Sequence, residues 1–175
     1  MSRETCFVSV LGWSGSGKTT FVVSALEECR RRGLSAAAVK RARHDADVSL
    51  DGKDSTLFLD AGAVTSLYVG DSRVARFSVT PTEQDRAFYL RECGDLDYIF
   101  MEGAEVEGCI RVGLAGSADR PEGLKRPAQE CDLVLSSDAG LVKALAGTAC
   151  LDPHAIPEII DFLEAHRAYR GTSAL

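Results

Sequence analysis

Short apolar runs alternate with helical patterns along most of the chain. Runs with the length of buried strands cover residues 6–11, 35–40, 97–103, 109–116 and 131–138. Apolar residues recur at helical spacing from Lys18 to Gly33 and again from about Pro153 onward. Strands that alternate with helices pair in parallel and lie between helical layers. The pattern therefore predicts an α/β fold, a three-layer sandwich around a mostly parallel sheet.

Two further strand patterns depart from this alternation. Residues 63–70 and 73–80 are separated by Gly70-Asp71-Ser72, a turn-rich link that predicts an antiparallel β-hairpin. Thr80 and Pro81 follow, and they have the character of an N-cap and a first helical residue, with Glu83 closing a capping box. We therefore expect a helix to begin at Thr80.

The stretch between the first strand and the first helix is rich in glycine and small polar residues. Gly12, Gly17, Lys18 and Thr19 match G-x-x-x-x-G-K-[ST], the Walker A pattern of a phosphate-binding loop. Its glycines let the backbone wrap an anion and aim several N–H groups at it, and the helix that follows adds partial positive charge. An ordinary Gly/Ser turn is the alternative, but the flanking strand and helix favour the loop.

This loop makes the predicted fold a P-loop NTPase sandwich, and we expect residues 1–175 to form a single nucleotide-binding domain. Lys18 would reach the β- and γ-phosphates and act in catalysis, while the Thr19 hydroxyl would bind Mg²⁺. The residues expected to bind nucleotide here are Gly12, Ser14, Gly15, Ser16, Gly17, Lys18, Thr19 and Thr20.

A carboxylate ends the most apolar strand. Glu102 follows four apolar residues, at the strand end where open α/β sheets bind ligands. Such a group could hold Mg²⁺ through water or orient a nucleophile, so Glu102 is expected to be both catalytic and part of the metal site. An ordinary solvated glutamate at a strand end is the alternative.

A charged segment, residues 39–55, follows the second strand and should lie beside the γ-phosphate, as switch loops do. Asp47 is the expected metal ligand, although Asp45 could take that role, and Lys40 or Lys53 could contact phosphate. A solvated charged loop would explain the same composition. The switch-loop candidates are Lys40, His44, Asp45, Lys53 and Asp54.

Recognition of the base has a weaker signal. The guanine motif [NT]-K-x-D is absent, but Ser137 and Asp138 end a strand in a comparable place. A carboxylate can accept both N1–H and N2–H of guanine, a donor pair that adenine lacks. A helix N-cap would explain Asp138 equally well, because a helical pattern resumes directly after it.

Charge and composition limit the expected partners and the expected cellular compartment. The formal net charge of −6 argues against nucleic acid as a partner. No apolar run approaches the length of about 18 residues that a membrane span needs, so no membrane partner is expected. Six cysteines without a C-x-x-C pair are typical of buried thiols in a cytoplasmic protein.

Taken together, these segments resemble the molybdopterin-guanine dinucleotide biosynthesis protein B (MobB) family. The resemblance covers nearly the whole chain, and its most specific part is Gly52-Lys53-Asp54-Ser55 followed by Ala61-Gly62-Ala63. It is carried by LGWSGSGKTT, VKRARHDADVSLDGKDS, DAGA (60–63), DYIFMEG, LSSD and the closing IPEIIDFL.

The resemblance implies a small GTP-binding protein with weak GTPase activity that assists the attachment of GMP to molybdopterin. The expected cofactors are GTP and Mg²⁺, and the expected partner is a molybdopterin guanylyltransferase or a molybdoenzyme. A homodimer built around an exchanged β-ribbon is also implied, which would suit residues 63–80. A non-catalytic nucleotide-dependent adapter and a P-loop small-molecule kinase or ligase are the alternative functions.

The chain departs from the family pattern in three places. Thr56, Leu57 and Phe58 follow the Asp-Ser pair, where the family usually has polar residues that often include histidine. Arg41 and Arg43 stand in a stretch where the family usually carries more histidine. Glu105 stands where the run after the buried strand usually has a lysine, so one basic substrate contact is missing.

Overall fold

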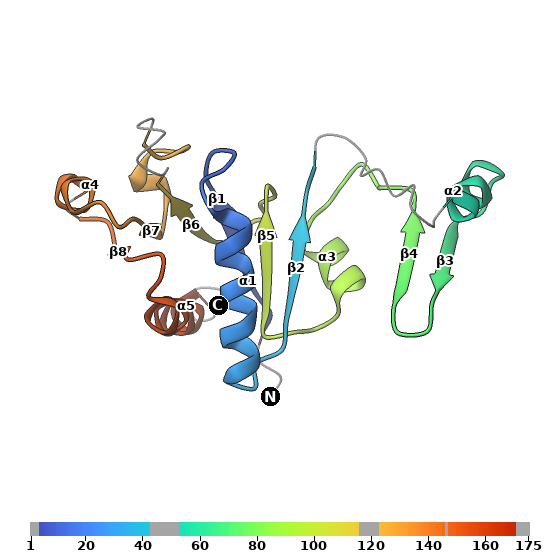
Figure 1. Ribbon diagram of the computed structural model, residues 1–175, viewed down its shortest axis with the longest axis horizontal. Coiled ribbons are helices and arrows are strands. Elements are labelled where there is room, and N and C mark those ends of the chain that lie inside the picture. Colours follow the sequence, from blue (N-terminus) through green and yellow to red (C-terminus); the bar gives the residue numbers. More distant parts are fainter. Residues whose placement is uncertain (1–3, 43–52, 116–122, 146, 171–175) are drawn as a thin grey trace. The chain divides into compact units, whose positions relative to one another are not determined.

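The structure is a computed structural model that describes residues 4–42, 53–115, 123–145 and 147–170 (Figure 1). The chain divides into two compact units, one made of residues 1–41 and 85–175 and the other of residues 42–84. Each unit is described by itself below, and the single-domain expectation stays a prediction.

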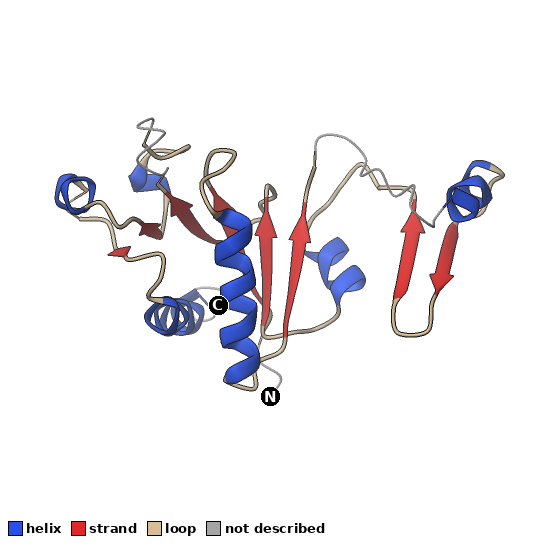
Figure 2. Cartoon of the chain, viewed as in Figure 1, coloured by secondary structure: helices blue, strands red, loops and turns tan. Residues whose placement is uncertain are grey.

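The first unit is built on a six-stranded sheet in which every pair of neighbouring strands is parallel (Figure 2). The order across the sheet is β2-β5-β1-β6-β7-β8. The strands that end in Lys40 (β2) and Glu102 (β5) therefore lie on one side of β1, and the other three strands lie on its other side. The predicted parallel sheet is confirmed, and β8 is a strand that the sequence pattern did not indicate. The strands are β1 (Cys6–Leu11), β2 (Ala36–Lys40), β5 (Tyr98–Glu102), β6 (Ile110–Leu114), β7 (Leu133–Leu135) and β8 (Cys150–Leu151).

Helices cover both faces of this sheet. Successive strand residues point to opposite faces, so Val8 joins a core with the helical residues Phe21 and Ile160, whereas Phe7 joins a core with Tyr89. The three-layer arrangement is therefore confirmed. In the described ranges, no helix is both long and apolar enough to cross a membrane. The helices are α1 (Lys18–Arg31), α3 (Arg86–Cys93), α4 (Ala139–Ala144), α5 (Ile156–Arg170) and the 3₁₀ turn η1 (Ala128–Glu130).

The helix expected to begin at Thr80 begins instead at Arg86. Asp85 is its N-cap, and its Oδ1 accepts the backbone N–H of Phe88 at 2.8 Å. A side-chain oxygen that meets an otherwise unpaired N–H of the first turn is what defines an N-cap. The earlier capping pattern at Thr80 was wrong because Asp85 supplies this hydrogen bond.

The second unit contains the predicted hairpin and one helix. The strands β3 (Thr65–Val69) and β4 (Val74–Ser78) pair antiparallel, with Leu67 opposite Arg76, so the hairpin is confirmed. The helix α2 (Lys53–Asp60) precedes it and contacts both strands. That helix begins inside the segment that we expected to be a charged loop, which is a correction to the sequence analysis.

A buried carboxylate, Glu28, belongs to an ion-pair network that connects the end of α1 to α5. Glu28 accepts hydrogen bonds from Arg31 Nε at 2.6 Å and from Arg32 Nε at 2.7 Å, and Arg32 also donates to Asp161 of α5 at 2.5 Å. The hydrogen bonds from Arg31 and Arg32 stabilise the ionised form, which lowers the pKa of Glu28 to about 2.

This lowered pKa predicts acid sensitivity. A carboxyl group whose pKa falls on folding stabilises the native state above its unfolded pKa, and this contribution is lost as the pH falls from about 4.5 towards 2. We expect Glu28→Gln to lower the melting temperature at pH 7 and to flatten its decline between pH 5 and pH 2. Glu27→Gln, at an exposed neighbouring position, is the control and should follow the wild type. Parallel curves of melting temperature against pH for Glu28→Gln and wild type would contradict the prediction.

Candidate functional site

The glycine-rich loop, residues 12–17, joins β1 to α1 at the carboxyl end of β1 (Figure 1). Gly15 and Gly17 have φ angles of 79° and 84°, a conformation that other residues rarely adopt. Gly12 is held in close contact, since a Cβ atom there would collide with Ser16 Oγ. Gly15 and Gly17 are thus required by the backbone conformation, and Gly12 leaves room for the Ser16 side chain. Glycines in such a loop let backbone N–H groups face an anion.

Ser16 gives an independent indication of what the loop holds. Its Oγ is buried and has no hydrogen-bond partner among the described residues. A buried hydroxyl without a partner costs about 1–3 kcal/mol. The side chain lies at the start of α1, where the helix adds partial positive charge. The residues present therefore fit a phosphate group, whose oxygens would accept from Ser16 and from the loop N–H groups.

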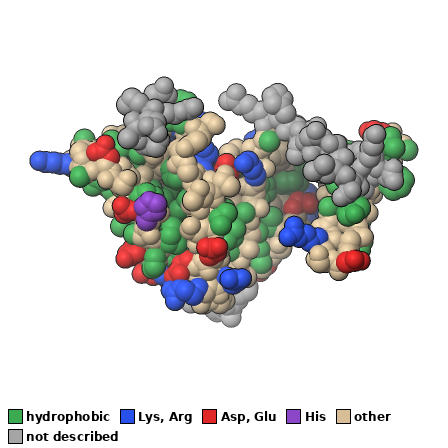
Figure 3. Space-filling model, in the orientation of Figure 1, with side chains coloured by type: hydrophobic (Ala, Val, Ile, Leu, Met, Phe, Trp, Pro, Cys, Tyr) green, Lys and Arg blue, Asp and Glu red, His purple; other side chains and the backbone are tan. Residues whose placement is uncertain are grey.

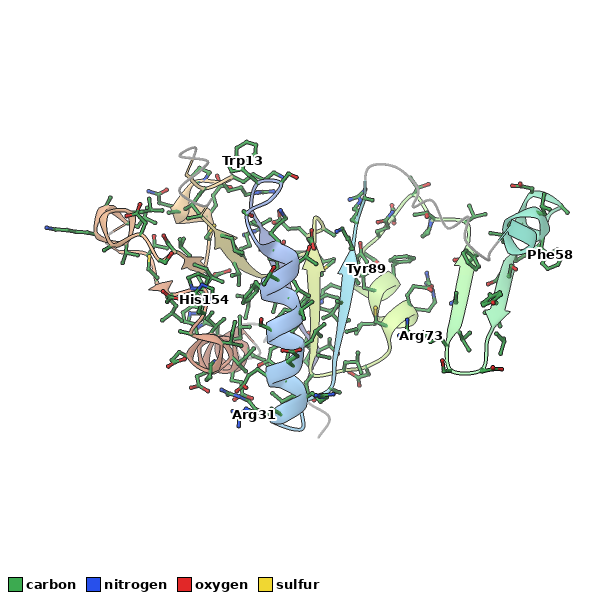
Figure 4. The ribbon with its side chains drawn as sticks, viewed as in Figure 1. Trp13, Arg31, Phe58, Arg73, Tyr89 and His154 are labelled. Atoms are coloured by element: carbon green, nitrogen blue, oxygen red, sulfur yellow. The ribbon has the colours of Figure 1, made fainter. Side chains whose placement is uncertain are left out.

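Lys18 lies over the loop that it was predicted to serve. Its Nζ donates to the carbonyl oxygen of Trp13 at 2.6 Å. Burial lowers the pKa of Lys18; the Glu102 carboxylate opposes this effect, and the positive charges of Lys125 and Lys40 add to it. Trp13 lies at the tip of the loop, 36% exposed (Figure 4). An anion bound beside the Lys18 ammonium would offset the repulsion between Lys18 and the positive charges of Lys125 and Lys40.

Thr19 and Glu102 meet as the sequence predicted. The Thr19 hydroxyl donates to Glu102 Oε2 at 2.8 Å, and Lys40 Nζ lies 3.6 Å from Glu102 Oε1. Hydroxyl and carboxylate oxygens are the ligands that Mg²⁺ prefers, so this pair fits a metal site. Lys40 was expected to contact phosphate, and the structure pairs it with the Glu102 carboxylate.

The backbone around Glu102 fixes where its side chain points. The Arg41 N–H donates to the Glu102 carbonyl at 2.9 Å, and Gly103 follows with a φ of 80°. A Cβ atom on Gly103 would lie 2.9 Å from the Arg41 carbonyl oxygen, closer than such atoms approach. Only glycine allows the chain to pass so close to β2 directly after the carboxylate.

A cavity of about 880 Å³ extends from the loop to α4 and α5. Polar groups from Ser16, Thr20 and Ser137 line it together with apolar side chains such as Phe21. Sequence reasoning found Ser16, Gly17, Thr20, Ser137 and Asp138 but missed several lining residues. Some of these could have been found, because Phe21 and Ser24 follow Gly17 at helical spacing on one face of α1. The missed residues are Phe21, Ser24, Leu114, Ala115, Gly123, Leu135, Ser136, Leu141, Pro153, His154 (Figure 4) and Ile156.

Asp138 serves as the N-cap of α4. Its Oδ1 accepts from the N–H groups of Gly140 at 2.8 Å and Leu141 at 3.1 Å, so the capping interpretation is confirmed. Both of these bonds go to one carboxylate oxygen, and the residue also lines the cavity beside Ser137. Contact with a guanine base stays a prediction, and capping does not oppose it.

The other predicted residues lie elsewhere in the chain or at the edge of the loop. Lys53 and Asp54 lie at the start of α2 in the second unit. His44, Asp45 and Asp47 lie outside the described residues, so their proposed roles stay predictions. Ser14 lies in the loop and is exposed.

Comparison with known proteins gives a consistent result. The family model described as "Molybdopterin guanine dinucleotide synthesis protein B" (MobB) matches residues 7–135. The "Molybdopterin-guanine dinucleotide biosynthesis adapter protein" of Escherichia coli K12 is 32% identical over 118 residues, which are 64% of this chain and 67% of that protein. A protein of the same description from Haemophilus influenzae is 26% identical over 94% of this chain and 90% of its own length.

Solved structures show the same fold. A crystal structure described as "molybdopterin-guanine biosynthesis protein B (mobB)" aligns with a TM-score of 0.66 at 21% identity, over 93% of this chain and 99% of its own. The crystal structure of Bacillus subtilis MobB aligns with a TM-score of 0.67 at 22% identity, over 90% of this chain and 97% of its own.

Proposed function

Because the chain belongs to the MobB family of molybdopterin guanine dinucleotide synthesis proteins, we propose that it binds GTP with Mg²⁺ and acts as an adapter in attaching a guanine nucleotide to molybdopterin. The observation that carries the nucleotide part is the phosphate loop with its buried, unpartnered Ser16 hydroxyl beside the Thr19–Glu102 pair. The family description and the relatives described as adapter proteins support the pathway and the role.

Different residues of the site would bind different parts of the Mg²⁺-triphosphate. The loop N–H groups and the Ser16 hydroxyl would donate hydrogen bonds to the phosphate oxygens, and Lys18 would neutralise their charge. Thr19 would hold Mg²⁺ directly and Glu102 would hold it through water, as in other phosphate-loop proteins. When bound, the metal neutralises charge on the β- and γ-phosphates. Weak hydrolysis would then depend on positioning and electrostatic stabilisation.

Guanine recognition is assigned to Ser137 and Asp138 at the far end of the cavity. The Asp138 carboxylate has the acceptor oxygens that match the N1–H and N2–H donors of guanine. Both residues line the cavity that begins at Ser16, which supports a nucleotide lying along α1. A small-molecule kinase or ligase would instead release ADP in the presence of its substrate.

Self-association is assigned to the hairpin. Leu67, Val69 and Val74 lie on one side of the ribbon and are 57%, 70% and 64% exposed. The opposite side carries buried Ser66, and Figure 3 shows further hydrophobic side chains at the surface of this unit. A two-stranded ribbon is marginally stable alone, and exposed apolar strands readily pair with another chain. We propose that a second copy of the chain covers this exposed apolar side of the hairpin, giving a homodimer.

Removing the Lys18 ammonium tests the phosphate site. Lys18→Ala should leave the fold intact and weaken Mg²⁺-GTP binding by well over tenfold, since hydrogen bonds to charged groups contribute about 1.5–3 kcal/mol. Calorimetry gives the affinity, and fluorescence of Trp13, the only tryptophan of the chain, gives an independent signal from the loop. Lys143→Ala on α4 is the matched control and should bind as the wild type does. Unchanged affinity in folded Lys18→Ala would rule out a phosphate-binding loop.

Glu102→Gln tests the metal site, because it keeps the size of the side chain and removes its charge. GTP binding without metal should change little, whereas the Mg²⁺-dependent part of affinity should fall. Turnover should fall by about 10²–10³, the usual cost of losing one transition-state contact. Turnover is measured against Mg²⁺ concentration and compared with the melting temperature. Intact hydrolysis with a lowered melting temperature would show that Glu102 is only structural.

Charge on the exposed side of the ribbon tests the dimer. Leu67→Glu and Val69→Glu should convert a dimer into a monomer at micromolar concentration, because like charges would be buried opposite each other. Ser72→Glu adds the same charge in the turn and should leave the dimer intact. Light scattering measures the mass of each variant. A monomeric wild type, or a dimer that survives both strand substitutions, would contradict this assembly.

A further inference from the structure

Two turns that follow neighbouring strands line the same part of the cavity. One turn, residues 136–138, follows β7, and the other, residues 152–155, follows β8. Ser136 from the first turn and His154 from the second (Figure 4) both line the cavity. The Ser136 N–H donates to the Leu151 carbonyl at 3.0 Å, and the two strands are parallel. Both turns therefore leave the same edge of the sheet and lie beside each other at the cavity.

The Ser136 side chain places a buried hydrogen-bond donor in this part of the cavity. The residue is 8% exposed, and its Oγ accepts the backbone N–H of Asp138 at 3.1 Å. A serine hydroxyl has one proton and two lone pairs, so this bond uses a lone pair and leaves the proton free to donate. Among the residues that the structure describes, none accepts that proton. A ligand with an acceptor atom here would therefore satisfy a buried donor.

The turn after β8 supplies the facing wall. Asp152 Oδ1 accepts the His154 N–H at 2.7 Å, and the Asp152 carbonyl accepts the Ala155 N–H at 3.0 Å, so the turn is fixed by its own hydrogen bonds. Leu141 of α4 and Ile156 of α5 add apolar surface to the same cavity. Apolar walls with a few fixed polar groups are typical of sites that bind a flat heteroaromatic ring.

The cavity has room for a sugar between this part and the phosphate loop. Ser24 of α1 also lines it, seven residues after Gly17. A helix rises about 1.5 Å per residue, so the cavity follows α1 for about 10 Å. A phosphate held at Ser16 and a ring held at Ser136 would then belong to one nucleotide that lies along α1.

We propose that the Ser136 hydroxyl donates to O6 of the bound guanine and so selects guanine over adenine. This inference rests on the proposed function, in which Asp138 accepts from N1–H and N2–H of the same base. O6 and N1–H are neighbours on one edge of guanine, and the Asp138 N–H lies 3.1 Å from Ser136 Oγ, so one turn offers the donor and the acceptor together. Adenine carries an amino group in place of O6 and would leave the Ser136 proton without an acceptor.

The test changes the donor and the acceptor separately. The probe is 6-thio-GTP, in which sulfur, a weak acceptor, replaces O6 while N1–H and N2–H remain. Ser136→Ala should weaken Mg²⁺-GTP binding by about fivefold, the usual loss for one neutral hydrogen bond. Wild type should bind 6-thio-GTP about fivefold more weakly than GTP, and Ser136→Ala should bind 6-thio-GTP as tightly as wild type does. Calorimetry at pH 7 gives the four affinities of this cycle.

Two controls keep the result independent of folding. Ser72→Ala makes the same substitution in the exposed hairpin turn and should bind both nucleotides as the wild type does. Thermal melting checks that each variant is folded. The preference of the wild type for GTP over 6-thio-GTP needs no variant, so equal affinities of the wild type for these two nucleotides would overturn the O6 contact even if Ser136→Ala did not fold.

The outcomes separate this inference from the proposed function. If the wild type prefers GTP to ATP but Ser136→Ala loses nothing, or loses as much for 6-thio-GTP as for GTP, the role of Ser136 alone is overturned. Equal losses for both nucleotides would show that the substitution only disturbs the turn that carries Asp138. A wild type that binds GTP and ATP equally well, or binds neither, would overturn the proposed guanine recognition and this inference with it.

Discussion

The hydrogen bond between Thr19 and Glu102 is the contact on which the arrangement of the site depends. It requires the carboxyl end of β5 to lie beside the carboxyl end of β1, and the register pairs Val10 with Glu102. Because side chains alternate between the faces of a strand, a slip of one residue would turn Glu102 to the other face. The fully buried run from Tyr98 to Met101 opposes such a slip, since each face of β5 packs in its own core. The hydrophobic core therefore determines where the carboxylate lies.

The chain directly after Glu102 connects two parts of the site. Gly103 passes close to β2, and the Ala104 carbonyl then accepts a hydrogen bond at 2.8 Å from the buried Ser9 hydroxyl in the middle of β1. Glu105 follows and pairs with Arg111 and Arg126. The family pattern that the sequence resembles has a lysine near this point. In this chain the acidic residue instead anchors, through Arg126, the segment that precedes η1.

Local chemistry explains what the sequence could predict. The phosphate loop is a local motif, so residues adjacent in the chain were enough to predict it. The short apolar runs were enough to predict the buried strands. Thr19 and Glu102 could be placed together because Glu102 ends β5 and Thr19 follows the loop after β1, and the carboxyl ends of parallel strands share one edge of the sheet. The hairpin was signalled by Gly70-Asp71-Ser72, and its pairing followed.

Contacts between distant residues explain what the sequence could not predict. The capping pattern at Thr80 predicted a helix start that is too early, because the side chain that caps α3 is that of Asp85. Asp138 had two roles that local sequence cannot separate, since an N-cap and a base acceptor need the same side chain. The path of the segment before η1 gave no signal at all, because it depends on Leu124 meeting Gly113 and on Arg126 meeting Glu105. Both are contacts between segments whose separation along the chain hides them.

The charge around the loop bears on whether such a site hydrolyses nucleotide or holds it. Lys18 would attract a bound triphosphate through its overall charge, which is present before any bond breaks. Interactions of equal strength in the ground state and the transition state tighten binding without raising the catalytic rate. Faster hydrolysis needs a group that acts on the attacking water or on the charge that develops late. In the described part of the site, the group that could act in this way is Glu102, and it already accepts from Thr19 and pairs with Lys40. The proposed triphosphate would therefore be retained with slow turnover, in keeping with the adapter role proposed above.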